Sequence, residues 1–274
     1  MKELEILKKN ANEIRKSIIK MVSEAKSGHP GGSLSIADIL SVLYFKEMNV
    51  DPKDPKAPNR DRFVLSKGHA SPAIYAALAE KGYFSKELLP TFRSYGSILQ
   101  GHPDMKKVPG IDISTGSLGQ GLSVANGMAL AARMSGQDYR TYVVLGDGEI
   151  QEGQIWEAAM TAAHYKLDNV CAILDNNNLQ IDGNCDKIKG IEPLDKKWES
   201  FGWNVVKIDG HKIESIICGL EAAKACKGKP TILIALTVKG KGVSFMEGVC
   251  GFHGVAPNKE ETVTALEELD RAKI

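Results

Sequence analysis

The first fifty residues carry apolar positions at helical spacing. Apolar side chains recur at every third or fourth position over residues 3–26, which predicts one long amphipathic helix. The glycine- and proline-rich residues 27–32 are expected to end it. A second helix is expected from about Ser35 to about Met48, because Ser35 and Asp38 have the spacing of a capping box.

Short apolar runs alternate with helical patterns from residue 62 onward. Strands are expected at residues 62–66, 141–145, 170–174, 204–208 and 231–237. Helices are expected at residues 71–81, 119–134, 153–165, 193–201, 213–226 and 259–273. Strands separated by helices are typical of a parallel sheet that is covered on both faces. We therefore expect a single α/β domain over residues 1–274, with a doubly wound, mainly parallel sheet, an N-terminal helical extension and a C-terminal helix.

Composition narrows the class of protein. The 274 residues are 43% hydrophobic and 25% charged, and the net charge of +1 gives no electrostatic reason to expect a nucleic acid or a membrane as partner. No apolar run reaches the roughly 18 residues of a membrane-spanning helix, and the charged N-terminus does not resemble a signal peptide. Five cysteines without a Cys-x-x-Cys pair favour a reducing, cytoplasmic location.

Polar residues directly follow two of the expected strands. Gly146-Asp147-Gly148-Glu149 comes after the first of them, and the polar turn Asp175-Asn176-Asn177-Asn178 is expected after the next. Because ligands of open α/β sheets bind at the carboxyl ends of the strands, Asp147 and Asn177 are expected to face one point if these strands are neighbours. Each segment alone is more often a plain turn or loop. Together they predict a site for Mg²⁺ and a diphosphate.

Four histidines stand next to glycine in expected loops, namely His29, His69, His102 and His253. Each one alone would be an ordinary loop residue, but as a set they predict a pocket that binds hydroxyls and a phosphate and moves protons near neutral pH. The two other histidines, His164 and His211, are interpreted as structural or solvated. The chain has no Walker P-loop, no Rossmann fingerprint and no His-Glu-x-x-His zinc motif.

These segments together resemble the transketolase family of thiamine-diphosphate enzymes. The motifs that carry the resemblance run in family order over almost the whole chain: Ser27-Gly28-His29-Pro30-Gly31, Leu65-Ser66-Lys67-Gly68-His69-Ala70, Gly101-His102-Pro103, Thr115-Gly116-Ser117-Leu118-Gly119-Gln120-Gly121, Gly146-Asp147-Gly148-Glu149, Glu152-Gly153, Asn177, Ile181-Asp182-Gly183 and Phe252-His253-Gly254. The resemblance implies the diphosphate-binding domain of the thiamine-diphosphate-binding fold.

The resemblance implies a role for each matching residue. Asp147, Asn177 and the carbonyl of Leu179 are the implied ligands of Mg²⁺ or Ca²⁺. The residues implied at thiamine diphosphate are His69, Gly116, Ser117, Leu118, Gly146, Gly148, Glu149, Asn177 and His253. The implied catalytic histidines around the donor sugar are His29, His102 and His253. Glu152, with Glu157 as a further candidate, is implied at a subunit interface linked to protonation of the cofactor.

The chain departs from the family pattern in three ways. Ser117 stands where many members have proline, and Asp104 where many have glutamate. The chain also resembles only the first domain of a full transketolase. Downstream of His253, nothing except the charged terminal helix is a candidate for the glutamate of the pyrimidine-binding domain that activates the cofactor. The resemblance therefore implies the N-terminal subunit of a split transketolase. A separate C-terminal subunit would complete an α2β2 assembly.

The implied reaction is transfer of a two-carbon ketol (glycolaldehyde) unit from a ketose phosphate to an aldose phosphate. Three alternatives stay open on the sequence alone. The chain could serve a related split enzyme that acts on an unusual sugar, or an enzyme similar to dihydroxyacetone synthase. It could also be a non-catalytic half that binds the cofactor.

Overall fold

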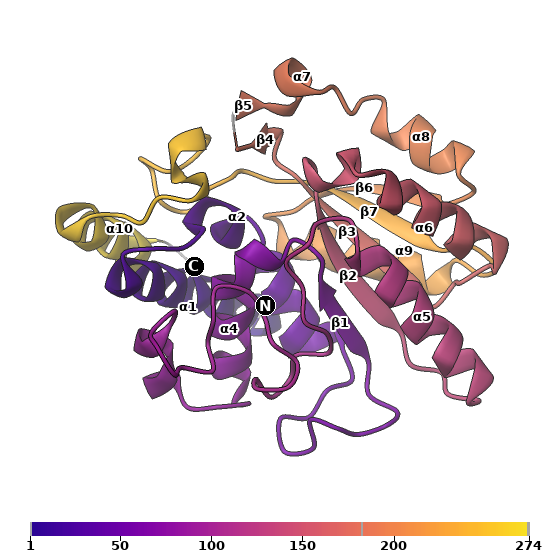
Figure 1. Ribbon diagram of the computed structural model, residues 1–274, viewed down its shortest axis with the longest axis horizontal. Coiled ribbons are helices and arrows are strands. Elements are labelled where there is room, and N and C mark those ends of the chain that lie inside the picture. The colour runs from indigo at the N-terminus through magenta and orange to yellow at the C-terminus, as the bar shows by residue number, and fades with distance from the viewer. Residues whose placement is uncertain (1, 182, 273–274) are drawn as a thin grey trace.

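The structure is a computed structural model that describes residues 2–181 and 183–272, so Asp182 of the motif above lies outside the described residues (Figure 1). At its centre is a five-stranded sheet in which every neighbouring pair of strands is parallel. In spatial order the strands are β1 (Arg62–Leu65), β2 (Thr141–Gly146), β3 (Val170–Asn176), β7 (Thr231–Leu236) and β6 (Asn204–Asp209). The predicted α/β class with a parallel sheet is confirmed.

Helices cover both faces of this sheet (Figure 1). One face carries α1 (Lys2–Ala25), α3 (Ala37–Val42), α4 (Ser71–Lys81) and α9 (Ile213–Ala225). The other carries α5 (Gly121–Met134), α6 (Gly153–His164) and α8 (Leu194–Ser200). The remaining helices are α2 (Pro30–Leu34), α7 (Cys185–Ile188) and α10 (Lys259–Arg271), of which α10 packs on α1. Among the described residues, no helix has the length and apolar character to cross a membrane.

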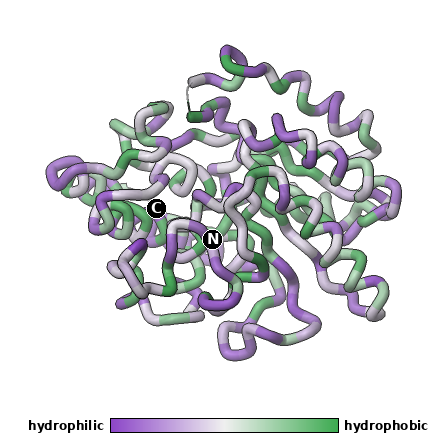
Figure 2. Tube along the Cα trace, in the orientation of Figure 1, coloured by the Kyte–Doolittle hydropathy of each residue, from purple (hydrophilic) through white to green (hydrophobic). Residues whose placement is uncertain are grey.

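The strands are buried on both faces, which explains their unbroken apolar sequences. In β2, Tyr142 and Val144 belong to the core cluster under α1 and α4, whereas Val143 and Leu145 belong to the cluster under α5 and α6. Successive side chains of a strand point to opposite faces, so a sheet covered on both sides needs apolar residues at every position. Figure 2 shows hydrophobic residues along these central strands and hydrophilic residues toward the outside.

The predicted helix start at Ser35 is wrong. Helix α2 already begins at Pro30, inside the segment that was expected to break helices, and α3 begins at Ala37. The Ser35 hydroxyl caps no helix; it donates to the Gly32 carbonyl at 3.1 Å and to Asp175 Oδ2 at 2.7 Å. Proline suits the first turn of a helix, and the partner of Ser35 is 140 residues away in the sequence, so local spacing could not identify it.

The region after β3 also differs from the prediction. Strand β3 continues to Asn176, so Asp175 is a buried strand residue and not part of a polar turn. It is followed by a small antiparallel pair, β4 (Leu179–Gln180) and β5 (Gly183–Asn184), that the sequence analysis missed. Each of these strands has two residues, too few to show an alternating pattern.

The carboxyl ends of four strands meet at one edge of the sheet. Strands β2 and β3 are direct neighbours, with Gly146 in register with Asp175, as the prediction for Asp147 and Asn177 required. The segments that follow β1 and β7 reach the same edge. This edge therefore gathers polar loops that are far apart in the sequence.

Candidate functional site

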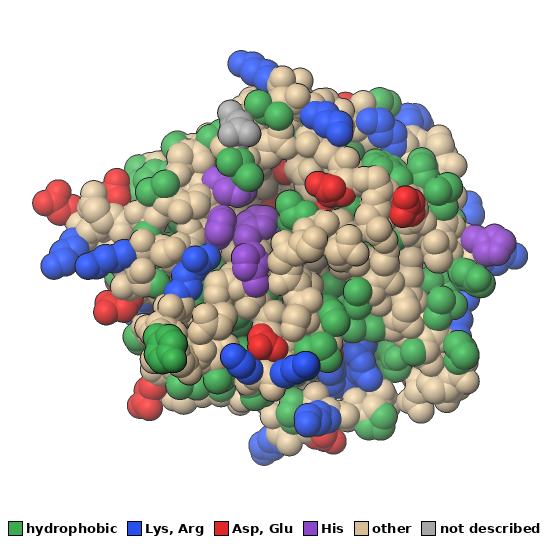
Figure 3. Space-filling view, in the orientation of Figure 1, with side chains coloured by type: hydrophobic (Ala, Val, Ile, Leu, Met, Phe, Trp, Pro, Cys, Tyr) green, Lys and Arg blue, Asp and Glu red, His purple; other side chains and the backbone are tan. Residues whose placement is uncertain are grey.

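A cavity of about 470 Å³ lies at this edge of the sheet. Its walls come from the loops after β1, β2, β3 and β7 and from the segments around His29 and His253. Figure 3 shows histidine side chains gathered in one patch on this face of the molecule. Crevices beyond the carboxyl ends of parallel strands are where ligands of open α/β sheets bind.

Asp147 is a buried acid in the turn after β2. Its Oδ1 accepts a hydrogen bond from the Gly148 amide at 2.8 Å, whereas its Oδ2 accepts none from an N–H or O–H group of the described residues. Burial, together with the negative charge of Asp175, raises the pKa of Asp147 to about 6. A buried carboxylate oxygen without a donor is costly unless a cation binds it.

Asn177 and Leu179 place two further oxygens at the same edge. The Asn177 amide donates to Asp175 Oδ2 at 3.1 Å, and its Oδ1 accepts from the Leu179 amide at 3.1 Å. The bond to Asp175 fixes the orientation of the Asn177 side-chain amide, because a carboxylate oxygen can only accept from the amide nitrogen. Asn177 and Leu179 line the cavity with Asp147.

This set of donors fits a hard divalent cation. Carboxylate, amide and carbonyl oxygens are the ligands that Mg²⁺ and Ca²⁺ prefer, with positions left for phosphate oxygens and water. Among residues 2–181 and 183–272, no group of three or more His, Cys, Asp and Glu side chains could hold a metal. The residues present therefore suit a magnesium or calcium site better than a zinc site.

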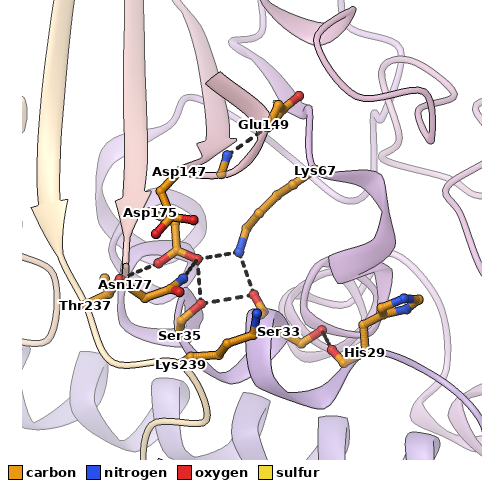
Figure 4. A network of polar contacts seen from close by, with 12 residues as sticks. His29, Ser33, Ser35, Lys67, Asp147, Glu149, Asp175, Asn177, Thr237 and Lys239 are labelled. Carbon is orange, nitrogen blue, oxygen red and sulfur yellow. Dashed lines mark hydrogen bonds and ion pairs between the residues drawn. The ribbon is translucent and has the colours of Figure 1, made fainter. Parts of the chain in front are cut away.

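A buried ion pair lies beneath these oxygens (Figure 4). Lys67 Nζ donates to Asp175 Oδ2 at 2.5 Å, and both side chains are almost completely buried. Ser35, Asn177 and Thr237 also donate to the Asp175 carboxylate. Burial alone would raise the pKa of Asp175, but Lys67, Thr237 and Ser35 hold the pKa below its ordinary value. Asp175 therefore stays charged, with its oxygens satisfied inside the protein.

Lys239 brings a second ammonium group into the cavity from the loop after β7. Its Nζ lies 3.2 Å from the Leu179 carbonyl and 2.7 Å from His253 Nδ1. Burial and the nearby Lys67 lower the pKa of Lys239. Two lysines at a cavity that also holds a metal-type oxygen cluster provide positive charge for an anionic ligand such as a diphosphate.

Three histidines meet on the opposite side of the cavity. The ring centroids are 5.1 Å apart for His29 and His69, 5.3 Å for His69 and His253, and 5.5 Å for His29 and His253. Burial is the main reason that the pKa values of His29 and His253 fall to about 4, and it takes the pKa of His69 well below 6.5. The rings are therefore neutral near pH 7. The rings of His29 and His69 each offer a nitrogen lone pair, whereas the lone pair of His253 Nδ1 accepts from the Lys239 ammonium. His29 Nδ1 is buried without a hydrogen-bond partner among the described residues.

His102 lies at the rim and does not line the cavity. Its ring packs on Gly116, where an added Cβ would come within 3.2 Å of the ring. The Tyr75 hydroxyl holds its backbone by donating to the His102 carbonyl at 3.1 Å. Burial and then Arg93 lower the pKa of His102. The structure thus brings His102 near the other three histidines without direct ring contact.

The remaining predicted residues lie at the mouth of the cavity. Gly116, Leu118 and Glu152 line it, whereas Ser117 is exposed and does not. Glu152 is exposed at the N-cap of α6. The exposed members of this group are open to contact with another molecule.

Glu149 is turned into the protein. One carboxylate oxygen accepts from the Ser66 hydroxyl and the Gly119 amide, and the other accepts from the Gly146 amide at 3.0 Å. Burial nevertheless raises its pKa. In this arrangement Glu149 ties together the loops after β1 and β2 and the start of α5.

Three residues of the site were not predicted from the sequence: Lys67, Asp175 and Lys239. Lys67 stands inside the segment that holds His69, and Lys239 follows an expected strand, so position at the sheet edge was an available signal. Asp175 was assigned to a loop. Nothing in the local sequence indicates that it is buried against Lys67.

Comparison with known proteins gives a consistent picture. The family described as "Transketolase, thiamine diphosphate binding domain" matches residues 6–270. A relative from Clostridium sp. (strain MSTE9), named 6-deoxy-6-sulfo-D-fructose transketolase subunit SqwG, is 49% identical, covering 97% of this chain and 96% of the relative. A relative from Phocaeicola vulgatus, named as one of the subunits of apulose-4-phosphate transketolase, is 46% identical, covering 97% of this chain and 95% of the relative.

Longer proteins match over only part of their length. Human transketolase is 41% identical, covering 97% of this chain but 42% of the human protein. The crystal structure of transketolase from Campylobacter jejuni aligns with a TM-score of 0.92 and 38% identity, covering 97% of this chain and 43% of that one. The chain is thus similar to one part of these proteins and to almost the whole length of the two relatives above.

Proposed function

Because the chain belongs to the transketolase family, we propose that it is the thiamine-diphosphate-binding subunit of a split transketolase, a single domain over residues 1–274. The assembled enzyme would transfer a two-carbon ketol unit from a ketose phosphate to an aldose phosphate. The observation that carries the proposal is the cavity at the sheet edge, where a carboxylate oxygen of Asp147 that has no hydrogen-bond partner in the described part of the chain lies among lysines and neutral histidines. Such a cavity suits a metal-bound diphosphate with sugar hydroxyls beside it.

The proposed metal is Mg²⁺ or Ca²⁺. It would be held by Asp147 Oδ2, by Asn177 Oδ1 and by the Leu179 carbonyl oxygen. The unpaired state of Asp147 Oδ2 and the fixed turn of the Asn177 amide support these assignments. Metal binding would also offset the cost of burying the Asp147 charge.

Thiamine diphosphate is the proposed cofactor. His69, Gly148 and His253 would contact its diphosphate, and Lys67 and Lys239 would balance its charge. Support comes from the lining of the cavity, which includes all five residues. When bound, the cofactor supplies the nucleophilic carbon on which the two-carbon unit is carried.

The ring end of the cofactor would lie at the mouth of the cavity. Gly116, Ser117 and Leu118 would border it, and Glu152 would act at the subunit interface there. The exposure of Ser117 and Glu152 supports an interface with another chain.

The histidines would bind the donor sugar and move its protons. The His29 ring is neutral near pH 7, and its buried Nδ1 has no hydrogen-bond partner among the described residues, so the ring offers a nitrogen lone pair that can accept a proton from a sugar hydroxyl. His253 would serve both the diphosphate and the sugar, and His102 would approach from the rim. A well-placed histidine contributes about 10²–10⁴-fold as an acid or base.

A separate C-terminal subunit is the proposed partner. It would bring the pyrimidine-binding domain, and two copies of each chain would form an α2β2 assembly. Support comes from the two relatives that are named transketolase subunits and that this chain matches almost end to end. We place the assembly in the cytoplasm, an assignment supported by the five free cysteines.

The donor sugar has a second candidate. Relatives at 49% and 46% identity are named for sulfofructose and for apulose 4-phosphate, whereas the human transketolase is 41% identical. Transfer of the same two-carbon unit from an unusual ketose is therefore a specific alternative to xylulose 5-phosphate.

Reconstitution with the partner tests the proposal. The purified chain with Mg²⁺, thiamine diphosphate, xylulose 5-phosphate and ribose 5-phosphate should show no ketol transfer, and activity should appear when the partner subunit is added. A chain carrying Asp147→Asn should stay inactive with the same partner. Parallel assays with 6-deoxy-6-sulfofructose and with apulose 4-phosphate would identify the donor. Robust turnover by the chain alone would contradict a split enzyme.

A further inference from the structure

A second buried polar network lies behind the loop that carries Lys239. Its members are Arg15 of α1, Asp38 of α3 and His211, which follows β6. Arg15 and Asp38 are buried, and the His211 side chain is 14% exposed. None of the three lines the cavity. The proposed reaction leaves this network without a role.

The contacts determine where the His211 proton lies. The Val238 amide donates to His211 Nε2 at 2.8 Å, so Nε2 carries a lone pair and the proton is on Nδ1. His211 Nδ1 then donates to Asp38 Oδ2 at 2.9 Å. Burial alone would raise the pKa of Asp38, but Arg15 and His211 hold that pKa below its ordinary value. A neutral imidazole thus links a charged carboxylate to a backbone amide.

The same network forms hydrogen bonds to the backbone on both sides of Lys239. His211 binds the amide of Val238, and Arg15 Nε donates to the carbonyl of Lys241 at 3.1 Å. Between these points the Gly240 amide donates to the Gly31 carbonyl at 3.0 Å. The loop is therefore held from outside the cavity while the ammonium of Lys239 reaches into it (Figure 4). A shift of this backbone would move that ammonium.

We propose that His211 is a positioning residue for Lys239. As a neutral donor to Asp38 and acceptor from Val238, it sets the loop so that Lys239 Nζ lies beside the Leu179 carbonyl and His253 and meets an incoming diphosphate. The proposal rests on the proposed function in one respect, namely that the cavity takes a metal-bound diphosphate. It adds a residue outside the cavity that controls affinity for that group.

Three substitutions separate the two hydrogen bonds of His211. His211→Gln keeps an acceptor near Val238 and loses the donor to Asp38, whereas His211→Asn keeps the donor and loses the acceptor. His211→Ala loses both.

The probes are inorganic pyrophosphate and thiamine diphosphate, each with Mg²⁺, titrated calorimetrically into the whole chain. We expect His211→Ala and His211→Asn to bind both about tenfold more weakly, the range found when a group behind a site is removed, and His211→Gln to recover most of the loss. The exposed His164→Ala is the matched control and should bind normally.

A double-mutant cycle tests whether the effect passes through Lys239. Lys239→Met should weaken binding by about tenfold or more, as expected when a charged hydrogen-bond donor is lost. Adding His211→Ala to Lys239→Met should then cause little further loss.

Additive losses would overturn the proposal, and so would normal affinity in His211→Ala or recovery by His211→Asn in place of His211→Gln. If His211→Ala fails to fold by circular dichroism, the Gln and Asn variants decide. Failure of the unaltered chain to bind either probe would overturn the proposed function as well, whereas binding without any His211 effect would overturn this inference alone.

Discussion

The floor of the cavity and its histidine wall are both polar and buried, but the floor contains charged side chains and the wall contains neutral ones. The floor, formed by Lys67, Asp175 and Asp147, contains an ion pair in which Asp175 has four kinds of donor. In the histidine wall, formed by His29, His69 and His253, the rings contact one another and are neutral near pH 7. Paired groups keep their charge when buried, and unpaired ones become neutral.

Because of this difference, the two regions suit different parts of the proposed ligands. The floor presents fixed charge, which suits a metal and a diphosphate that stay bound through many turnovers. The wall presents neutral rings, which suits hydrogen bonding to a reacting sugar and uptake of a proton from it. Asp147 stands between the two types, since its pKa is raised to about 6 and one of its oxygens is unpaired.

Removing single histidines should separate the loss of activity from the loss of cofactor binding. In the assembled enzyme, His29→Ala and His102→Ala are each expected to lower turnover or donor affinity, by about 10²-fold where an acid–base group is lost, with cofactor binding near normal. His69→Ala should instead weaken cofactor binding first, because the proposed function assigns His69 to the diphosphate. Steady-state kinetics and a thiamine-diphosphate titration measure the two effects. Three variants that all match the parent in both assays would disprove the pocket.

Breaking the ion pair of the floor should unfold the chain more easily. Asp175→Leu leaves the Lys67 ammonium buried without its partner and should lower the free energy of unfolding by about 3–5 kcal/mol. The control is the double variant Asp175→Leu with Lys67→Met, which contains no unpaired charge and should lose less. Urea denaturation measures both. A double variant that is less stable than the single one would contradict the assigned role of the pair.

Removing Asp147 should affect binding and spare stability. Asp147→Ala is expected to weaken Mg²⁺-dependent binding of thiamine diphosphate by about 100-fold or more, because loss of a ligand should exceed the effect of losing a group behind it. The cofactor-free chain should be no less stable, since a buried and partly unpaired carboxyl is removed. A titration of the Asp147→Ala and Asp138→Ala variants tests this, Asp138 being an exposed acid. Unchanged affinity would reject the metal assignment.

Acid should weaken the cofactor-free chain through the histidine wall, by a smaller amount. The pKa values of His29 and His253 fall from 6.5 to about 4 on folding, so the unfolded chain binds more protons between these values. Stability should therefore fall as the pH drops from 6.5 to about 4 and gain nothing from this source above 6.5. Denaturation midpoints across that range should fall less for a variant with His29→Gln and His253→Gln. Equal slopes for both proteins would contradict the pKa assignment.

The sequence alone was sufficient for the fold class and for the segments of the site. Buried parallel strands need apolar residues at every position, and helices on the sheet need them at every third or fourth, so both are visible in the order of residues. Asp147 and Asn177 were found because they directly follow two such strands. The four glycine-flanked histidines were found in the same way, as polar residues in short loops.

Only the tertiary structure determined which polar groups are paired. Ser35 looked like a helix cap, and its hydroxyl instead donates to Asp175 in a strand far along the chain. Asp175 looked like a loop residue, and it is the buried partner of Lys67. His211 was expected to be structural or solvated, and the structure decides for structural by placing it between Asp38 and the Val238 amide. A hydrogen bond or ion pair between distant segments leaves no periodic trace in the sequence, because it depends on how the strands are ordered in the sheet and on how deeply each side chain is buried.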